Sequence, residues 1–172
     1  MQVLNETARP AQSKSYMWVY RSGEFAVHPA VIFDYQPSRS GRCVADFLGD
    51  YAGYLLTDGY AAYDTLENVM HAGCMAHVQG KFTEAHTIQP GKKVGRAEQG
   101  LKLLVYLKDG HISLDNNVTE RDIRPFMTGR KNRLFFTSAE GAFASANLYS
   151  LVMTCRANGI NLYFYFRHIF TE

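Results

Sequence analysis

The spacing of apolar residues predicts strands in the first part of the chain. Residues 15–20 and 30–33 are short runs rich in aromatic and β-branched side chains, and Gly23 provides a turn between them. Together these two runs predict a β-hairpin. Residues 1–4 form a third, shorter run that is typical of the last part of a strand.

A helical period follows the hairpin. Apolar side chains at i, i+3, i+4 and i+7 mark one face of a helix that Ser40 caps and Gly53 ends, namely Val44, Phe47, Leu48 and Tyr51. Residues 54–57 are then a compact apolar run of the buried-strand type, which Asp58-Gly59 stops. Beyond it the pattern predicts a short helix over 60–66, a strand over 69–75 and the start of a helix over 76–85.

The second half of the chain is predicted to be mainly helical. Residues 89–96 form a loop by composition, and a helix follows over 101–108 that Gly110 closes. The clearest amphipathic helix ends at Asn158-Gly159, and its apolar stripe is predicted to be core: Leu148, Leu151, Val152 and Cys155. Residues 162–170 are ambiguous between a strand and a helix, and the spacing of Leu162, Phe166 and Ile169 favours a helix. This order of elements predicts an α/β fold with a mixed sheet flanked by helices.

The composition is that of one globular domain. The chain has 172 residues, of which 47% are hydrophobic and 20% are charged, which is enough to bury a core. No apolar run approaches the roughly 20 residues of a membrane helix, and the N-terminus lacks the features of a secretory leader, so the expected location is the cytoplasm. Three cysteines far apart in the sequence predict reduced, mostly buried thiols.

Asp58 is the first residue with candidate chemistry. It follows the apolar run 54–57 directly, so it should project from the carboxyl end of a buried strand, where reacting groups collect in open α/β sheets. The structural alternative is a turn aspartate that accepts a hydrogen bond from its own backbone near Gly59. The local sequence favours this alternative.

Glu120 is the second candidate carboxylate. If Asn117 caps the helix that begins there, Glu120 completes a capping box, and it also stands four residues before Arg124. Pro125 is expected to limit this helix. The functional alternative is that Glu120 shares a divalent cation with Asp58, because Mg²⁺ and Mn²⁺ prefer such oxygen ligands. Spacing does not choose between these alternatives.

The series His-x-x-Cys-x-x-His, formed by His71, Cys74 and His77, is similar to part of a zinc site. Structural zinc needs four ligands, and no second pair with suitable spacing is present. We therefore expect Cys74 to be buried and His77 to be hydrogen-bonded.

Basic residues are concentrated in one stretch although the net charge is only +2. Five of the 18 Lys and Arg residues lie there: Arg121, Arg124, Arg130, Lys131 and Arg133. By itself this enrichment favours a solvated basic face. The adjacent Phe135-Phe136 favours core packing over stacking on unpaired bases.

Several short motifs occur in a fixed order along the chain. They are Asp58-Gly59-Tyr60-Ala61-Ala62-Tyr63, Cys74-Met75-Ala76-His77, Asp115-Asn116-Asn117 with Glu120-Arg121, Gly129-Arg130-Lys131-Asn132, and Ala144-Ser145-Ala146-Asn147-Leu148-Tyr149. This ordered set resembles the insertion-sequence-66 family of bacterial transposases. The likeness runs from about Gln2 to the last residues.

The resemblance implies an RNase H-like catalytic core that cleaves and transfers DNA strands with an Asp-Asp-Glu (DDE) triad and Mg²⁺ or Mn²⁺. Asp58 matches the second aspartate of the triad and Glu120 its glutamate. The implied partners are the DNA of transposon ends and target, with a homo-oligomer in a full-length form and no membrane. The resemblance also places His77 and Asn117 next to the site. It implies that five basic residues contact DNA phosphates, namely Arg121, Arg124, Arg130, Lys131 and Arg133.

The chain departs from the family pattern in two places. The first aspartate belongs to an Asp-Glu-Thr element just before residues that resemble 1–4, so the sequence is expected to begin after it. Asn5-Glu6-Thr7 imitates this element but lies past the strand, and we do not accept it as a substitute. A long charged insertion of the family is expected to be shortened over residues 82–101.

These departures define the expected organisation and the competing functions. We expect residues 1–172 to be one catalytic-core fragment, with a sheet-rich half over 1–85, a shortened insertion over 86–100 and a helical half over 101–172 that carries the glutamate. The leading hypothesis is a DDE transposase core with impaired catalysis. The alternatives are a non-catalytic remnant that binds DNA or oligomerises, and a metal-free structural domain.

Overall fold

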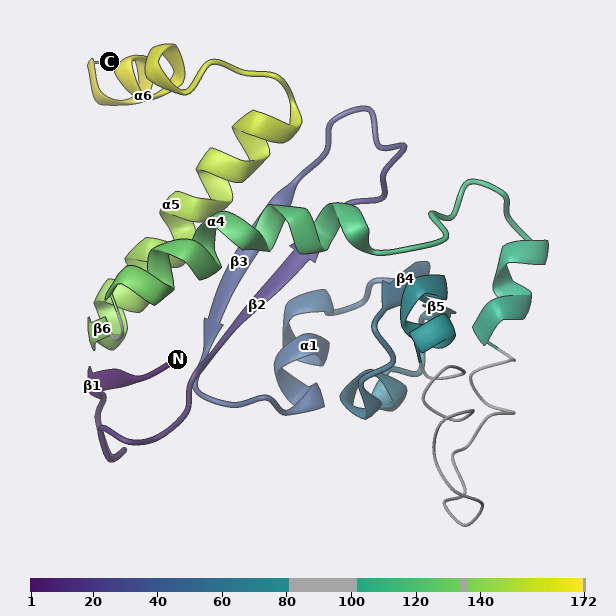
Figure 1. The fold of residues 1–172 in the computed structure, drawn as a ribbon, viewed down its shortest axis with the longest axis horizontal. Coiled ribbons are helices and arrows are strands. Elements are labelled where there is room, and N and C mark those ends of the chain that lie inside the picture. Colours follow the sequence, from purple (N-terminus) through teal and green to yellow (C-terminus); the bar gives the residue numbers. More distant parts are fainter. Residues whose placement is uncertain (81–101, 134–135, 172) are drawn as a thin grey trace. The chain divides into compact units, whose positions relative to one another are not determined.

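The computed structural model of this chain describes residues 1–80, 102–133 and 136–171 (Figure 1). The predicted loop over 89–96 and residues 81–85 of the predicted helix over 76–85 lie outside these residues. The described chain divides into two compact units. We call residues 1–39 with 119–172 the terminal unit and residues 40–118 the central unit, and each is described by itself.

The terminal unit is built around the predicted hairpin. Its strands β2 (Tyr16–Arg21) and β3 (Val31–Gln36) are antiparallel, with Val19 opposite Phe33. A second pair, β1 (Val3–Asn5) and β6 (Phe136–Ser138), is parallel. Its helices are most of α4 (Asn117–Arg133), α5 (Ala139–Ala157) and α6 (Leu162–Thr171).

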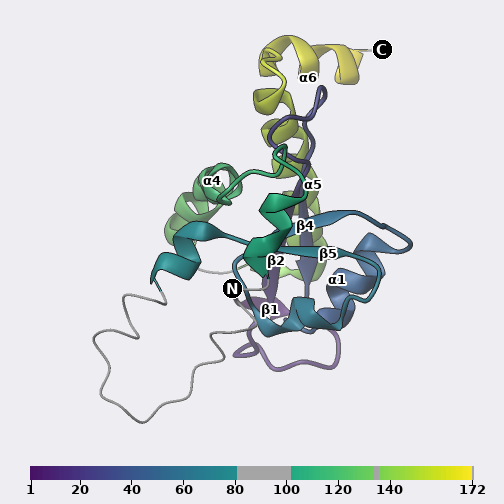
Figure 2. The same cartoon turned by 90° about the vertical axis from the view of Figure 1, so that its right-hand side faces the viewer.

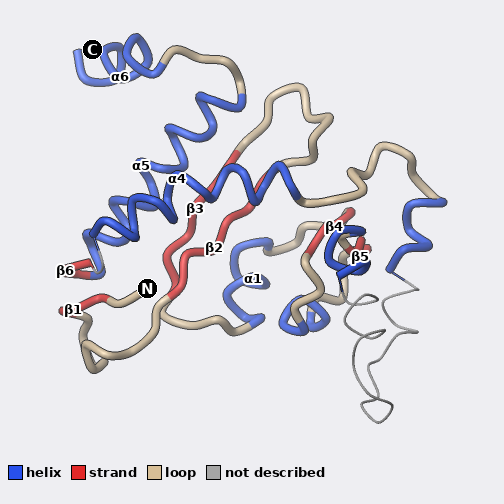
Figure 3. The backbone as a smooth tube through the Cα atoms, viewed as in Figure 1, coloured by secondary structure: helices blue, strands red, loops and turns tan. Residues whose placement is uncertain are grey.

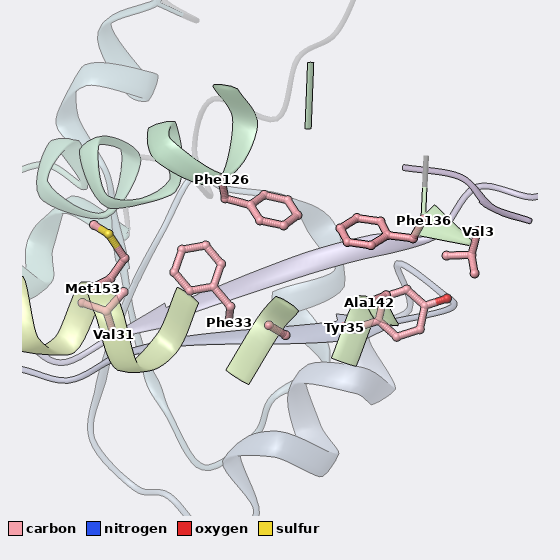
Figure 4. Packing of buried hydrophobic residues seen from close by; sticks show 9 residues of the cluster. Val3, Val31, Phe33, Tyr35, Phe126, Phe136, Ala142 and Met153 are labelled. Carbon is pink, nitrogen blue, oxygen red and sulfur yellow. The ribbon is translucent and has the colours of Figure 1, made fainter. Parts of the chain in front are cut away.

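The core of the terminal unit lies between β3, α4 and α5. Alternate residues of β3 are buried, which is the period expected of a strand with one covered face: Val31, Phe33 and Tyr35. The Phe33 ring lies 5.8 Å from that of Phe126 on α4, measured between centroids, and Phe126 stacks on Phe136 at 6.5 Å (Figure 4). Burial of Phe136 confirms the core assignment made for it, whereas Phe135 lies outside the described residues.

The central unit contains a parallel strand pair of the βαβ type. Strands β4 (Tyr54–Thr57) and β5 (Met70–Gly73) pair in register, with Thr57 opposite Gly73, and the short 3-10 helix η1 (Ala61–Thr65) lies between them in the sequence (Figure 2). Helix α1 (Gly41–Leu48) precedes β4, residues 75–80 are helical, and a second 3-10 helix, η2, spans Leu104–Leu107.

Capping explains the boundaries of two helices. The Ser40 hydroxyl accepts a hydrogen bond from the Arg42 backbone amide at 3.3 Å, which confirms the predicted N-cap of α1. The helix ends at Gly49, whose φ is +53°, and not at Gly53 as predicted. Helix α5 ends as predicted, because Gly159 adopts a left-handed φ of +67°.

The fold is α/β as predicted, but the strands of the described residues form three two-stranded sheets instead of one mixed sheet. Hydroxyl groups of α5 occupy the outer edge of β3. The backbone amides of Val31 and Phe33 donate to Thr154 Oγ1 at 2.9 Å and to Ser150 Oγ at 2.8 Å. These bonds leave no room for another strand at those positions.

Two further predictions are wrong. Helix α4 does not stop at Pro125 but continues to Arg133 (Figure 3). Proline removes one helical hydrogen bond, and burial of the next residue, Phe126 at 3% exposure, offsets that cost. The stripe of α5 is also only partly core, because Leu148 and Leu151 are 51% and 38% exposed.

The residues that the helix actually buries are mostly smaller: Ala142, Ala146, Met153 and Cys155. Small side chains allow α5 to lie close against β3, so its inner face is not the one with the largest apolar residues. Within the described residues, no helix is both long and apolar enough to cross a membrane.

Candidate functional site

Asp58 stands at the carboxyl end of β4, as the sequence predicts. It is half-buried, and its Oδ1 accepts a hydrogen bond from the Tyr60 backbone amide at 3.1 Å. Gly59 between them has a φ of +78°, a conformation that favours glycine. The turn alternative is therefore confirmed for one oxygen. Within the described chain, the second oxygen of Asp58 accepts no hydrogen bond and forms no ion pair.

Parallel pairing brings the end of β5 beside Asp58. The strands are in register up to Thr57 and Gly73, and the Cys74 amide donates to the Thr57 carbonyl at 3.0 Å. The residues that follow the two strands, Asp58 and Cys74, therefore emerge at the same edge of the pair. This is the edge at which βαβ units present ligand-binding groups.

A small hollow opens at this edge. It leaves about 20 Å³ of free space, enough for a water molecule. Asp58 and His77 both line it, together with Gly73 and Cys74. His77 lies on the helical residues 75–80, one turn beyond the end of β5. His77 and Asp58 thus line the same hollow, and a role for His77 beside a catalytic site stays a prediction.

Lys102 also lines this hollow, a position that the sequence did not indicate. Its ammonium group lies 2.6 Å from Asp64 Oδ1, which ties it to η1. No motif or period marked Lys102, because the lysine is close in space to Gly73 but 29 positions away in the sequence. Local sequence carries no signal for such a contact.

The His71, Cys74 and His77 series does not form a metal site. The Cys74 thiol is buried and donates to Asn116 Oδ1 at 3.1 Å, and His71 Nε2 lies 3.1 Å from the Leu66 carbonyl oxygen. The expectation of a buried Cys74 is thus confirmed. Elsewhere in the described residues, no three His, Cys, Asp or Glu side chains gather in a way that could hold a metal ion.

Glu120 lies in the first turn of α4 and is half-buried. The helix begins at Asn117, so Asn117 is its first residue and not its cap, and Glu120 falls one position too late for the predicted capping box. Asp115 Oδ1 accepts the Asn117 amide at 3.0 Å and turns the chain into the helix. The pairing of Glu120 with Arg124 stays a prediction.

The two candidate carboxylates belong to different units, with Asp58 in the central unit and Glu120 in the terminal unit. Their convergence on one cation therefore stays a prediction. Asn117 is exposed, and it is His77 that the structure brings to Asp58.

The predicted cations are spread over both the exposed and the covered sides of α4. Arg121, Arg124 and Lys131 are exposed, whereas Arg130 is half-buried. The side chain of Arg133 lies outside the described part of the chain. On the covered side, Asp122 pairs with Arg21 of β2, with Nε and Oδ2 2.8 Å apart.

Glu6, which imitates part of the family's first acidic element, has a structural role. Its Oε2 lies 2.6 Å from Arg9 and 3.4 Å from the hydroxyl of Ser15, a fully buried residue. Arg9 also donates to the Ser15 hydroxyl at 3.0 Å. Glu6 therefore stabilises the turn after β1.

Curated relatives of the chain come from Sinorhizobium fredii (strain NBRC 101917 / NGR234). The uncharacterized protein y4qI is 24% identical over 225 residues, covering 87% of this chain and 42% of the relative. The uncharacterized protein y4jD is 24% identical over 208 residues, covering 78% of this chain and 40% of the relative. The uncharacterized protein y4hP is 40% identical over 57 residues, covering 33% of this chain and 10% of the relative. The chain thus spans less than half the length of these relatives.

The first two alignments are longer than the whole chain, so these relatives carry residues without a counterpart here. No solved structure matches the chain. The family model described as "Transposase IS66 family" matches residues 1–102 and, in a second segment, residues 96–144. The quoted motifs from Asp58 to Lys131 fall within these two segments. The chain belongs to the IS66 family of transposases.

Proposed function

We propose that this chain contributes the catalytic core of a DDE-type transposase, which cleaves DNA phosphodiesters and transfers the strands to a target. The observation that carries the proposal is Asp58 at the shared carboxyl edge of β4 and β5, in a chain of the IS66 transposase family. We further propose that the complete core is RNase H-like. The activity of a whole enzyme is part of this proposal, because the chain spans less than half the length of its curated relatives.

Asp58 fits the role of a cation ligand because one of its oxygens holds the turn and the other has no partner among the described residues. A half-buried carboxylate of this kind is stabilised when a hard cation binds it. In the proposal, Asp58 and Glu120 hold Mg²⁺ or Mn²⁺. When bound, such ions supply charge stabilisation to phosphodiester chemistry and lower the pKa of an attacking water.

The residues of the chain itself perform two further tasks in the proposal. Arg121, Arg124 and Lys131 bind phosphate oxygens and fix the DNA backbone, a contact that reads no bases. His77 lines the hollow beside Asp58, where its ring would shield part of a bound cation from water.

Titration of the chain with Mn²⁺ tests the two ligands. We expect Asp58→Asn and Glu120→Gln each to weaken Mn²⁺ binding at least tenfold, because each removes one anionic oxygen ligand from the site. Exposed carboxylates in the same units provide matched controls, namely Asp46→Asn on α1 and Glu140→Gln on α5. Mn²⁺ affinity that is unchanged in Asp58→Asn would refute the site.

Cleavage separates the catalytic proposal from its alternative. The family resemblance adds a third carboxylate from a strand that precedes residues 1–4 in the family pattern. We therefore expect a polypeptide of residues 1–172 alone to nick DNA at near-background rates, and expect a polypeptide extended by that strand to nick it in a Mn²⁺-dependent manner. Binding without cleavage by the extended form would favour the DNA-binding or oligomerising alternative.

A further inference from the structure

Helix α6 is strongly apolar, yet none of its ten residues is buried in the described structure. Seven of the ten are apolar or aromatic, and Phe164 and Phe170 are 63% and 76% exposed. Arg167 stands three residues from each of these rings, so the three side chains follow one exposed side of the helix. A free helix of this length is marginal in water, and apolar helices are normally enclosed by protein. The exposed side of α6 is therefore expected to meet a further protein surface.

Helix α5 carries a second apolar surface that is partly exposed. Leu148 and Leu151 stand three residues apart on one side of the helix and are 51% and 38% exposed. Glu140, which is also exposed, lies on the same side eight residues before Leu148. The opposite side of α5 contains Ala142 and Ala146, which are buried in the core. We call the side with Glu140, Leu148 and Leu151 the outer side of α5.

A hydrogen-bonded turn directs α6 away from the outer side of its own α5. Gly159 has a left-handed φ of +67°, and the Ile160 amide donates to the Cys155 carbonyl at 2.9 Å, as in a Schellman helix end. Asn161 Oδ1 then accepts the Tyr163 amide at 3.0 Å and caps α6. Figures 1 and 2 show α6 crossing the end of α5 and not lying along its length. Both helices belong to the terminal unit.

We propose that a second copy of this chain binds here, with α6 of each copy on the outer side of α5 of the other. The two surfaces are complementary, because α6 presents two rings and the cation of Arg167, and α5 presents two leucines and the carboxylate of Glu140. A two-fold contact covers both surfaces of both copies at once. The family resemblance implies a homo-oligomer without naming a contact surface, and α5 and α6 supply one. The proposed dimer is independent of the proposed metal chemistry.

The exposed area is sufficient for a specific dimer. An aromatic side chain has a surface of about 150–250 Å², so Phe164 and Phe170 at these exposures offer roughly 280 Å² per copy. The two leucines add to it. Interfaces are only about 57% apolar, so this apolar area belongs to a contact of at least about 500 Å² per partner. Two copies then reach the total of about 1,000 Å² that specific interfaces exceed.

The composition of α6 favours a protein partner over a lipid surface. A helix that lies on a membrane has a strongly polar face opposite its apolar face. Residues 162–166 of α6 are five consecutive apolar or aromatic residues, which span more than one turn and leave no side of the helix entirely polar. The cation of Arg167 also stands between two exposed rings and not opposite them.

Sedimentation equilibrium of the 172-residue chain from about 1 to 100 µM measures the dimer, and we expect a dissociation constant on the order of micromolar. Phe170→Ser and Leu148→Ser should each weaken it at least tenfold, because each change occurs twice in a two-fold interface. Val27→Ser, between β2 and β3 of the same unit and 86% exposed in wild type, is the matched control and should leave the constant unchanged. Circular dichroism checks that each variant is folded.

A mixing experiment identifies the helices that meet. Leu148→Glu and Phe164→Lys should each prevent self-association, because both contacts of either homodimer are then damaged. A mixture of the two variants should form a heterodimer. In it, one contact between α5 and α6 is wild type, and the other pairs the two opposite charges.

Three results would overturn the proposed dimer. The first is a chain that stays monomeric throughout the concentration range. Binding of that monomer to vesicles of anionic phospholipid would assign α6 to a lipid surface, and its failure to bind them would leave the additional residues of the longer relatives as the occupant. The second is a dimer that persists in folded Phe170→Ser and Leu148→Ser. The third is a mixture of Leu148→Glu and Phe164→Lys that stays monomeric. Mn²⁺ binding tests the proposed function separately from all three.

Discussion

At the scale of single residues, the structural role of Asp58 in a turn is compatible with the proposed role as a cation ligand. The carboxylate has two oxygens, and the turn with Tyr60 uses one of them. The sequence predicted both the strand end and the turn, because an apolar run followed by Asp-Gly specifies both. It did not predict Lys102 in the same hollow, because that contact depends on tertiary structure.

Tyr106 has a pH dependence that follows from its partial burial at the end of β5, where its hydroxyl donates to the Gly73 carbonyl at 2.8 Å. Burial raises the pKa of Tyr106 from 10.0 to about 12, with smaller contributions from the neighbouring Cys74 and Asp115. The folded chain therefore holds the phenolic proton more tightly than the unfolded chain. The stabilisation that this provides is fully present below pH 10 and is lost as the pH rises through about 12.

We expect the unfolding free energy of wild type to fall more steeply between pH 10 and 12 than that of Tyr106→Phe, which has no proton to lose there. Denaturant unfolding at a series of pH values measures this difference. An exposed tyrosine of α6, changed in Tyr163→Phe, serves as the control and should leave the pH profile of wild type intact. Identical profiles for Tyr106→Phe and wild type would contradict the assignment.

At the scale of elements, periodicity located most helices and strands but misjudged where they end and which side is buried. Pro125 was expected to stop α4, yet the helix continues because Phe126 packs against Phe33 and Phe136. Gly129, in a quoted motif, has a packing reason of its own. A Cβ there would lie 2.7 Å from the Tyr149 hydroxyl of α5, so glycine leaves room for the end of this side chain.

Hydroxyl groups of α5 replace a neighbouring strand at the outer edge of β3, and this arrangement predicts a measurable cost. Thr154→Val and Ser150→Ala each leave a backbone amide of β3 without its acceptor, at Val31 and at Phe33. An unsatisfied buried amide costs about 1–3 kcal/mol. We expect each variant to lower the free energy of unfolding by that amount.

Urea unfolding monitored by circular dichroism measures the effect of these two changes. Ser145→Ala, in the same helix and without a bond to β3 in the described structure, is the matched control and should change stability by less than about 0.5 kcal/mol. A loss in Ser145→Ala as large as in Ser150→Ala would show that the helix, and not its bond to the strand, accounts for the effect.

At the scale of the whole molecule, the sequence predicted the α/β class and the family but not the division into units. Periodicity reports which residues of an element face inward, not which strands pair with one another. The parallel pair β1–β6 joins residues more than 130 positions apart, and no local pattern specifies such a pairing. The convergence of Asp58 and Glu120 is the same kind of long-range question.

The overall charge is only +2, so any affinity for DNA must come from where the cations lie. Arg124 and Lys131 are exposed and stand seven residues apart on α4, which places them on one side of the helix. If both contact phosphates, the slope of log affinity against log salt concentration should fall in magnitude by about one for each that is removed. The loss should be the same for DNA of any sequence.

Fluorescence anisotropy with labelled duplexes at several salt concentrations measures these slopes. We expect Arg124→Gln and Lys131→Gln each to weaken binding and flatten the slope, and Arg130→Gln to do so less because Arg130 is half-buried. Arg42→Gln removes an equally exposed cation from α1, where Asp46 already pairs with it, and should leave the slope unchanged. Because every variant removes one positive charge, net charge alone would flatten all four slopes equally. A flattening that is largest in Arg124→Gln and Lys131→Gln and absent in Arg42→Gln would therefore locate the DNA on α4. Equal flattening in all four variants would contradict a DNA interface on α4.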